Sequence, residues 1–451
     1  MNTSLHYIVL LCTAILLLAS VATAADEPAS YEFQSRRKVG QIDRCNVLLE
    51  ASGDLLVKSA SGEKPERQEV SLSCHRDYDE KTLQLPAAAD KTLRGIRYYR
   101  EATAKLRKGT VTLNPALRPE HRLVAVEIVG SKATPFSPRG PLSVAELELL
   151  SAVGETLPLD QLLPDNPVKI GDAWPLPGEM VALLLGLDEV TSNSVQTTLK
   201  EVTPEFARFE LAGQAEGKLY GASNQISLKA KCRFDRKTGR IDWFAMRLQQ
   251  RREVSVVEAG LDWTFLVQAK IAPAEASQEL SAATLADLPL KPTAALLRVQ
   301  YQLAEGECQL SHDRDWFLTN HYSDQDEFHR LDGDQDIGMC EVSPQPQVSL
   351  AKLPSLAQFQ DIVQKALGSN FGQIEDVSEG LNAAHLRVLR VSVKGADNGL
   401  PVHWFYYHVS DPEGRQVTLT FRVEDKHREA FGRADDALVQ SLRFLEKVEK
   451  K

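Results

Sequence analysis

Three alternating aspartates, Asp332, Asp334 and Asp336, come nearest to a metal site in this sequence. Alternate carboxylates on a tight turn place several oxygens on one side, as a hard cation such as calcium requires. The match then fails, because Ile337 stands where such a loop needs its turn glycine and Ser343 where it needs a bidentate glutamate. We hypothesise a low-affinity divalent-cation site here, with solvated hairpin tips as the alternative. No other cofactor is indicated.

Five cysteines follow the N-terminal apolar run and could form disulfides if the chain is exported. The candidate pairs are Cys45 with Cys74 and Cys308 with Cys340. In an antiparallel hairpin, a register that sets Cys45 opposite Cys74 also keeps the apolar faces of the two strands in agreement. The alternative for each pair is two buried thiols, because a bridge needs a short Cβ separation. Cys232 is left over and is interpreted as a small buried hydrophobe.

The sequence lacks the common catalytic motifs. It contains neither G-x-S-x-G nor H-E-x-x-H, and neither of the glycine-rich nucleotide-binding motifs. This favours a non-enzymatic protein. A secreted hydrolase with a carboxylate-based site is the alternative, since 62 acidic residues offer many pairs that only the fold could bring together.

The charge balance argues against nucleic acid as a partner. The chain has 52 Lys and Arg against 62 Asp and Glu, a net charge of -10, and phosphate backbones must be met by clustered cations. Residues 301–350 hold eleven acids and two arginines, whereas residues 25–275 are nearly neutral. The net negative charge is therefore concentrated around the predicted cation site.

Residues 1–24 are typical of a secretory signal peptide, with an apolar run from Tyr7 to Ala19 and small residues before Ala25. The run is short for a membrane span, which needs about 20 residues, so a retained anchor is the lesser alternative. No later stretch is long and apolar enough to span. We expect an exported protein, periplasmic or extracellular.

Residues 25–272 are expected to form a large, mostly antiparallel β domain, because short apolar runs alternate with period two. The clearest strand pair is 225–234 with 240–250, joined by a turn at 235–239 that contains glycine. A helical insert at about 142–187 interrupts the strands. Its helices are predicted from a capping box that opens at Ser143 and from Met180–Leu185 before Gly186.

A linker at 273–294 is predicted to lead into a second, α+β domain over 295–451. The elements expected there are an amphipathic helix at 355–367 with Leu356, Phe359, Ile362, Val363 and Leu367 on one side, strands at 385–393, 402–409 and 416–423, and a closing helix at about 424–444. Helices bracketing an antiparallel sheet make this a layered αβα sandwich. The aromatic strand around Trp404 is interpreted as its covered centre.

The order of motifs in the second domain resembles the PsbP-like αβα sandwich. The likeness rests on Trp316 and Cys340, the helix Phe359 to Leu367, Arg390, Trp404 and Tyr407 in the meander, and the ending Leu438 to Phe444. It implies a mostly non-catalytic accessory or assembly module, and no catalytic residue is carried over.

The first domain resembles uncharacterised exported bacterial β proteins, on residues 168–174 and on the strand that enters the turn 235–239. Its architecture is similar to that of LolA-like lipoprotein carriers. That likeness implies a β sheet curved around an apolar cleft, lidded by the insert with Leu183, Leu184 and Leu185 facing in. The leading hypothesis is thus an exported binding or accessory protein for a partner protein or a lipid-like amphipathic ligand.

Overall fold

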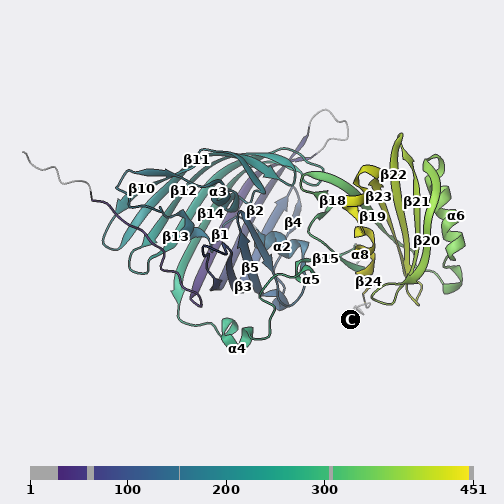
Figure 1. The fold of residues 1–451 in the computed structure, drawn as a ribbon, viewed down its shortest axis with the longest axis horizontal. Helices are drawn as coiled ribbons and strands as arrows, with labels where there is room; N and C mark the ends of the chain where they lie inside the picture. Colours follow the sequence, from purple (N-terminus) through teal and green to yellow (C-terminus); the bar gives the residue numbers. More distant parts are fainter. Residues whose placement is uncertain (1–28, 58–64, 152, 304–307, 446–451) are drawn as a thin grey trace, which may run out of the picture.

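A computed structural model describes residues 29–57, 65–151, 153–303 and 308–445 (Figure 1). The predicted signal peptide lies outside the described residues. The structure is mostly antiparallel β with a few helices, in agreement with the coarse α+β prediction. Among the described residues, no helix combines the length and the apolar character needed to cross a bilayer.

A curved sheet of thirteen strands makes up most of the first half of the chain (Figure 1). Its central pair joins the first long strand to the last. In spatial order the main path is β6 (Lys132–Phe136), β5 (Leu123–Val129), β3 (Leu93–Lys108), β2 (Glu66–Gln84), β1 (Ile42–Val57), β14 (Gly260–Ala274), β13 (Arg240–Arg252), β12 (Ala222–Asp235), β11 (Phe206–Leu219), β10 (Gln196–Val202) and β8 (Ala173–Pro175). β4 (Val111–Leu113) pairs with β3, and β9 (Glu189–Asn193) pairs with β11.

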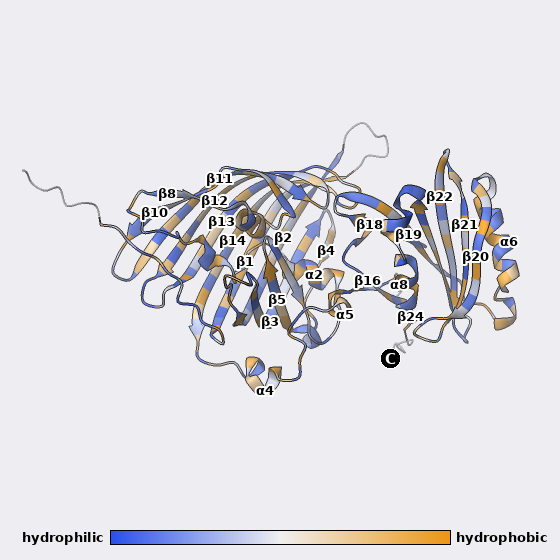
Figure 2. Cartoon of the chain, in the orientation of Figure 1, coloured by the Kyte–Doolittle hydropathy of each residue, from blue (hydrophilic) through white to orange (hydrophobic). Residues whose placement is uncertain are grey.

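The period-two pattern divides this sheet into a core face and an outer face. In β12, Ile226, Leu228 and Ala230 are buried, whereas Lys229 and Lys231 between and beside them are exposed. Figure 2 shows the same alternation of apolar and polar residues along the neighbouring strands. The predicted hairpin of β12 and β13 is confirmed.

The predicted insert, residues 142–187, contains β7 (Leu142–Ser143), α2 (Val144–Ser151), η2 (Leu159–Leu162) and α3 (Gly178–Leu185), and it is not entirely helical, because β8 also lies within it and pairs with β10 of the large sheet. The predicted capping box is confirmed, because Glu146 N–H donates to Ser143 Oγ at 3.2 Å and Ser143 N–H donates to a Glu146 carboxylate oxygen at 2.9 Å. Gly186 ends α3 in the left-handed conformation, with φ of 67°. Local sequence signals therefore set the start of α2 and the end of α3.

The predicted linker is folded against the sheet. It includes η3 (Gln278–Leu280) and α4 (Ala282–Leu285), followed by α5 (Ala294–Leu297). Its leucines cover an apolar patch of β3, β5 and β6; the cluster includes Ile96, Leu123, Ala125, Phe136, Leu280, Leu285, Leu288 and Leu290.

A small four-stranded sheet connects the two predicted domains. Its order is β24 (Arg443–Phe444), β16 (Cys308–His312), β15 (Val299–Gln302) and β7 of the insert. β15 pairs with β7 in parallel through Val299 and Leu142. The C-terminal part of the chain is thus hydrogen-bonded to the insert.

The third sheet has seven antiparallel strands. They are β17 (Trp316–His321), β18 (Asp326–Asp332), β19 (Gln335–Gln345), β23 (Gln416–Glu424), β22 (Leu400–Ser410), β21 (Arg387–Asp397) and β20 (Phe371–Leu381), in spatial order. α6 (Leu356–Leu367) packs on one face through Phe359, Val363 and Leu367, and α7 (Arg428–Phe431) and α8 (Ala434–Gln440) pack on the other (Figure 1). Three short 3-10 turns lie at Leu350–Lys352, Gly368–Asn370 and Asp425–His427, and a fourth, in the large-sheet half, at Pro119–His121.

Two expectations for this region are wrong in detail. Ile362, predicted on the buried side of α6, is 53% exposed. The predicted closing helix is interrupted, because Gly432 adopts φ of 59° between α7 and α8, and the chain then ends in the short strand β24.

Candidate functional site

The three aspartates of the predicted cation site point to different partners. Asp334 accepts a hydrogen bond from Lys218 Nζ at 3.0 Å, and Asp336 is 2.8 Å from His329 Nδ1. Asp332 lies exposed at the end of β18. Among the described residues, no group of three or more His, Cys, Asp or Glu side chains could hold a metal ion. The side-chain geometry therefore does not support the predicted site.

Asp334 instead takes part in a contact between two hairpins. Lys218 precedes the β11–β12 turn of the large sheet, and Asp334 lies in the β18–β19 turn. The ring of Tyr220, in that same β11–β12 turn, lies 4.8 Å from the ring of Phe317 in β17. The acidic turn thus helps to hold the seven-stranded sheet against the large one.

The predicted Cys45–Cys74 disulfide is not formed. The expected register is wrong, because Cys45 lies opposite Tyr78 and Cys74 opposite Leu49. Both are buried free thiols on the core face. Burial raises the pKa of Cys45 well above its ordinary value, which keeps the sulfur protonated and unreactive.

The predicted Cys308–Cys340 bridge is not formed either. Cys340 is a buried free thiol whose S–H donates to the backbone oxygen of Glu341 at 3.8 Å. Cys308 and Cys340 both belong to the core under α8. Cys232 is buried in the core of the large sheet, as interpreted, and burial raises its pKa to about 12.

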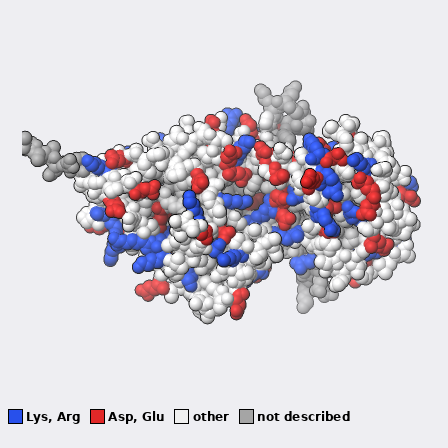
Figure 3. Space-filling model, viewed as in Figure 1, with Lys and Arg blue, Asp and Glu red and all other residues white. Residues whose placement is uncertain are grey.

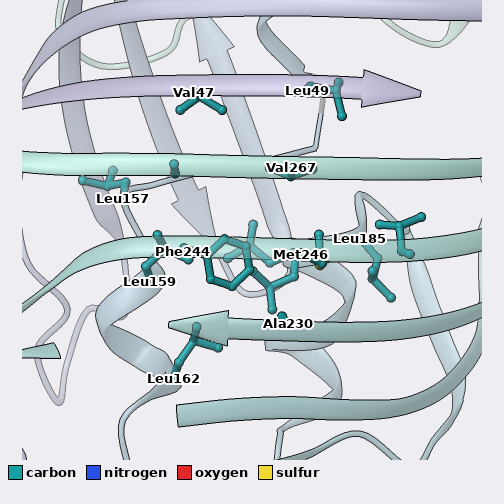
Figure 4. Packing of buried hydrophobic residues seen from close by; sticks show 14 of the residues in the cluster. Val47, Leu49, Leu157, Leu159, Leu162, Leu185, Ala230, Phe244, Met246 and Val267 are labelled. Atoms are coloured by element: carbon teal, nitrogen blue, oxygen red, sulfur yellow. The ribbon is translucent and has the colours of Figure 1, made fainter. Parts of the chain in front are cut away.

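The concave face of the large sheet is filled by the insert. Leu183, Leu184 and Leu185 are buried, as expected. Figure 4 shows Leu157, Leu159 and Leu162 of the insert packed among side chains from the facing strands, including Val47, Ala230, Phe244, Met246 and Val267. The space that the carrier hypothesis assigns to a lipid is therefore occupied by the chain's own side chains.

Buried ion pairs link the insert to the large sheet. Arg97, 1% exposed on β3, pairs with Glu80 of β2 at 2.7 Å and with Glu155 of the insert. Burial alone would raise the pKa of Glu155, but the Arg97 guanidinium outweighs it and lowers this pKa. Tyr78 OH and Thr156 Oγ1 hydrogen-bond at 2.7 Å beside the pair.

A second buried cluster, around the Glu146 carboxylate of α2, predicts that the stability of the fold decreases in acid. Burial alone would raise the pKa of Glu146, but hydrogen bonds from Arg118, His121 and two backbone N–H groups hold it far below its ordinary value of 4.5. A carboxylate with a lowered folded pKa stabilises the fold fully above its unfolded pKa, and this contribution is lost as the pH falls below about 4.5.

We therefore expect Glu146→Gln to lower the free energy of unfolding at pH 7 by about 1–3 kcal/mol and to flatten its decline below about pH 5. Urea unfolding measured from pH 3 to pH 7 checks this. A variant curve parallel to the wild-type curve across that range would contradict the assignment.

The outer face of the large sheet carries an accessible candidate site. One side chain from each of six neighbouring strands lies in a single cross-strand row: Ser71, Ser52, Thr264, Gln249, Ser227 and Gln214. We call this set the outer row. Strands in a sheet lie about 4.8 Å apart, so the outer row is roughly 24 Å long. Every member is uncharged and carries a hydroxyl or an amide.

A cavity of about 760 Å³ lies over the outer row from Ser52 to Gln214 and continues to Ser194. Ser194 closes this end, because its hydroxyl donates to Gln214 O at 3.1 Å and accepts from Gln214 N–H at 3.0 Å. A second cavity of about 400 Å³ shares Ser52 and Thr264 and extends past Ser71. Together we call the two cavities the outer groove.

The outer groove has one apolar segment and charged margins. Leu266, 46% exposed on β14, lines it between Thr264 and Glu50. Lys105 and Arg107 flank the end beyond Ser71, and Asp262, Arg251 and Glu216 lie along one long side of the groove, in the next cross-strand row. Of the described residues that line the larger cavity, Trp263 is the one aromatic, and its ring lies on the core face beside Phe265.

The outer row could not be predicted from the sequence, because its members come together only across strands. Each strand contributes one Ser, Thr or Gln, and in the sequence each of these has the pattern of an ordinary solvent-facing strand residue. The signal that could have found it is the register, which aligns polar uncharged residues between charged ones on either side.

Comparisons with known proteins give only distant structural matches. No protein family and no curated protein matches it. A solved structure from Bacteroides thetaiotaomicron VPI-5482 is 10% identical, with a TM-score of 0.25 over 34% of this chain and 50% of that one. A lipovitellin structure on lipid–protein interactions is 11% identical, with a TM-score of 0.31 over 55% of this chain and 27% of that one.

The Tle4–Tli4 complex is also 11% identical, with a TM-score of 0.21 over 48% of this chain and 73% of the matched one. This chain thus spans about half and about a quarter of the first two structures. TM-scores this low do not establish a shared fold, so function rests on the geometry of the chain itself.

Proposed function

We propose that this chain is an exported, non-enzymatic protein that binds an extended segment of a partner polypeptide along the outer groove. The observation that supports it is the outer row. Hydroxyls and primary amides both donate and accept hydrogen bonds, so a row of them complements the alternating N–H and C=O groups of an extended backbone. The row is long enough for about seven residues of such a segment.

The chemistry of the groove favours a peptide over other extended ligands. An acyl chain needs continuous apolar surface, whereas the outer row is polar from end to end. Sugar rings stack on exposed aromatic faces, and Trp263 faces the core. Leu266 offers one apolar contact, and the charged margins would select the flanking side chains of the segment.

Export is supported by residues 1–24, which combine an uncharged apolar run with small residues at its end. An extracellular or periplasmic protein meets partner chains outside the cytoplasm. Detection of the mature chain beginning at Ala25 in the exported fraction would check this part of the proposal.

A bulky side chain in the groove is expected to weaken peptide binding. Random peptides about seven residues long, displayed on phage, are selected against the wild-type protein. Thr264→Trp fills the centre of the outer row, and we expect it to weaken the selected peptides at least tenfold, about 1.4 kcal/mol. Isothermal titration measures the change.

Gln268→Trp is the matched control, because Gln268 lies on the same strand and the same outer face, four residues away from Thr264 and outside the groove. It should leave the affinity unchanged. Equal loss in both variants, or a selection that yields no binding peptide, would remove the proposal.

A further inference from the structure

Two neighbouring turns at one end of the large sheet carry exposed cations. One turn, residues 35–41, presents Arg36 and Lys38, and the other, residues 235–239, presents Lys237. Arg36 N–H donates to Gly239 O at 2.8 Å. Gly239 is needed there, since it has φ of 69° and a Cβ would lie 2.5 Å from Arg36 Cγ. Figure 3 shows Lys and Arg gathered at the lower left, at this edge of the sheet.

A cavity of about 680 Å³ opens at these turns. Its described lining is Arg36, Arg37, Lys38, Val39, Gln41 and Thr238. Arg37 forms the buried wall, with its side chain 4% exposed and its Nε donating to Asp160 at 3.0 Å. The cavity therefore has exposed cations at its mouth and the ion-paired Arg37 in its wall.

Behind this wall, buried guanidinium nitrogens lie among carboxylates at ion-pair rather than hydrogen-bond distance. Arg37 Nη1 has no hydrogen-bond acceptor, and neither Nε nor Nη2 of Arg240 has one. Arg37 Nη1 lies 3.6 Å from a Glu80 carboxylate oxygen and 3.8 Å from Asp43 Oδ2, and Arg240 Nε lies 3.9 Å from Asp160 Oδ2. These ion pairs hold the Arg37 side chain in the wall of the cavity.

The carboxylates near the cavity already form ion pairs or hydrogen bonds within the chain. Asp43 pairs with Arg240 at 2.5 Å, Asp160 pairs with Arg37, and Glu80 pairs with Arg97. Asp235 accepts from the backbone N–H groups of residues 237 and 238. The exposed cations Arg36, Lys38 and Lys237, in contrast, form no ion pair with any described residue, so the mouth of the cavity stays positive.

We propose that this cavity binds a phosphate-type oxyanion. Its oxygens would accept from Arg36, Arg37 and Lys38, and the guanidinium fork is suited to a phosphate in two simultaneous hydrogen bonds. The anion is either free in solution or the headgroup of an anionic lipid. The site is separate from the outer groove, which lies on the other side of the sheet and closer to its opposite end.

Inorganic phosphate is the probe for the site itself. Titration into the full-length mature protein, followed by calorimetry and by the phosphate-induced rise in melting temperature, should show saturable binding. Arg36→Gln/Lys38→Gln removes the two exposed cations and should weaken binding at least tenfold. Both residues are exposed, so the melting temperature without phosphate should stay at the wild-type value.

Lys229→Gln/Arg247→Gln is the matched control. It removes one Lys and one Arg that lie opposite each other on the outer face, away from the turns. Its phosphate affinity should stay within twofold of wild type. Equal losses in the two double variants would show a non-specific charge effect and overturn the proposal, as would the absence of saturable binding to the wild type.

Vesicles distinguish the two sources of the anion. Phosphatidylcholine vesicles with and without phosphatidylglycerol are sedimented with each protein. Co-sedimentation that needs phosphatidylglycerol, is lost in Arg36→Gln/Lys38→Gln and is displaced by phosphate assigns the site to a lipid headgroup. Saturable phosphate binding without co-sedimentation assigns it to a free oxyanion.

Discussion

Replacing Arg97 by Met is expected to lower the free energy of unfolding by about 3–5 kcal/mol. The substitution removes the buried cation that pairs with both Glu80 and Glu155, so Glu155 loses its paired cation and Glu80 keeps only Arg37 at 3.6 Å. The insert would also lose one of its fastenings to the sheet. Urea unfolding at pH 7, followed by tryptophan fluorescence, measures the loss.

Arg233→Met is the control for this prediction. Arg233 also makes a paired contact with a carboxylate, Asp242, but its side chain is 48% exposed. Exposed ion pairs contribute about 0.2–1 kcal/mol, so the control should lie near wild type. Similar losses in the two variants would show that the buried network has no special role.

Phe244→Ala is expected to cost about 3–5 kcal/mol, because it opens a cavity between β13 and the insert. Phe244 is 1% exposed, and Figure 4 shows it close to Leu159. The insert should then detach more readily, which hydrogen exchange of the 142–187 amides would reveal as faster exchange than in wild type.

Leu266→Ala tests the opposite face of the same sheet. Leu266 lies on the adjacent strand and is exposed, so its removal should change stability by no more than about 0.5 kcal/mol. A loss as large as that of Phe244→Ala would mean that the outer face is packed against something in solution.

Local signals in the sequence predicted local structure well. Ser143 and Glu146 identified the start of α2, Gly186 identified the end of α3, and the alternation along β12 identified its buried face. Each depends on residues within a few positions of one another. The prediction of one continuous closing helix was wrong, although the signal against it is also local: Gly432 adopts a positive φ and interrupts the helix.

Long-range pairing could not be predicted in the same way. The expected register of β1 on β2 and the observed one differ by an even number of residues, and any even shift keeps the same side chains on the core face. Apolar patterning therefore left several registers equally acceptable. The disulfide prediction and the undetected outer row both follow from that degeneracy.

The predicted cation site failed because a turn separates the three aspartates: Asp332 ends β18, Asp334 lies in the turn and Asp336 belongs to β19. Asp334 and Asp336 are two residues apart, yet one reaches Lys218 of another sheet and the other reaches His329 of its own. The spacing of the aspartates in the sequence could not predict these partners, which come from other strands.

The pairing of β1 with β14 has a consequence for how the molecule is made. These strands lie at the centre of the large sheet, from Ile42 opposite Ala274 to Leu56 opposite Gly260, although they are the first and last long strands of that region. Contacts between residues so distant in the chain form slowly, because a long loop must close first. The nascent polypeptide cannot complete this sheet until residue 274 has emerged, which leaves a long interval in which the β14 side of β1 has no partner strand.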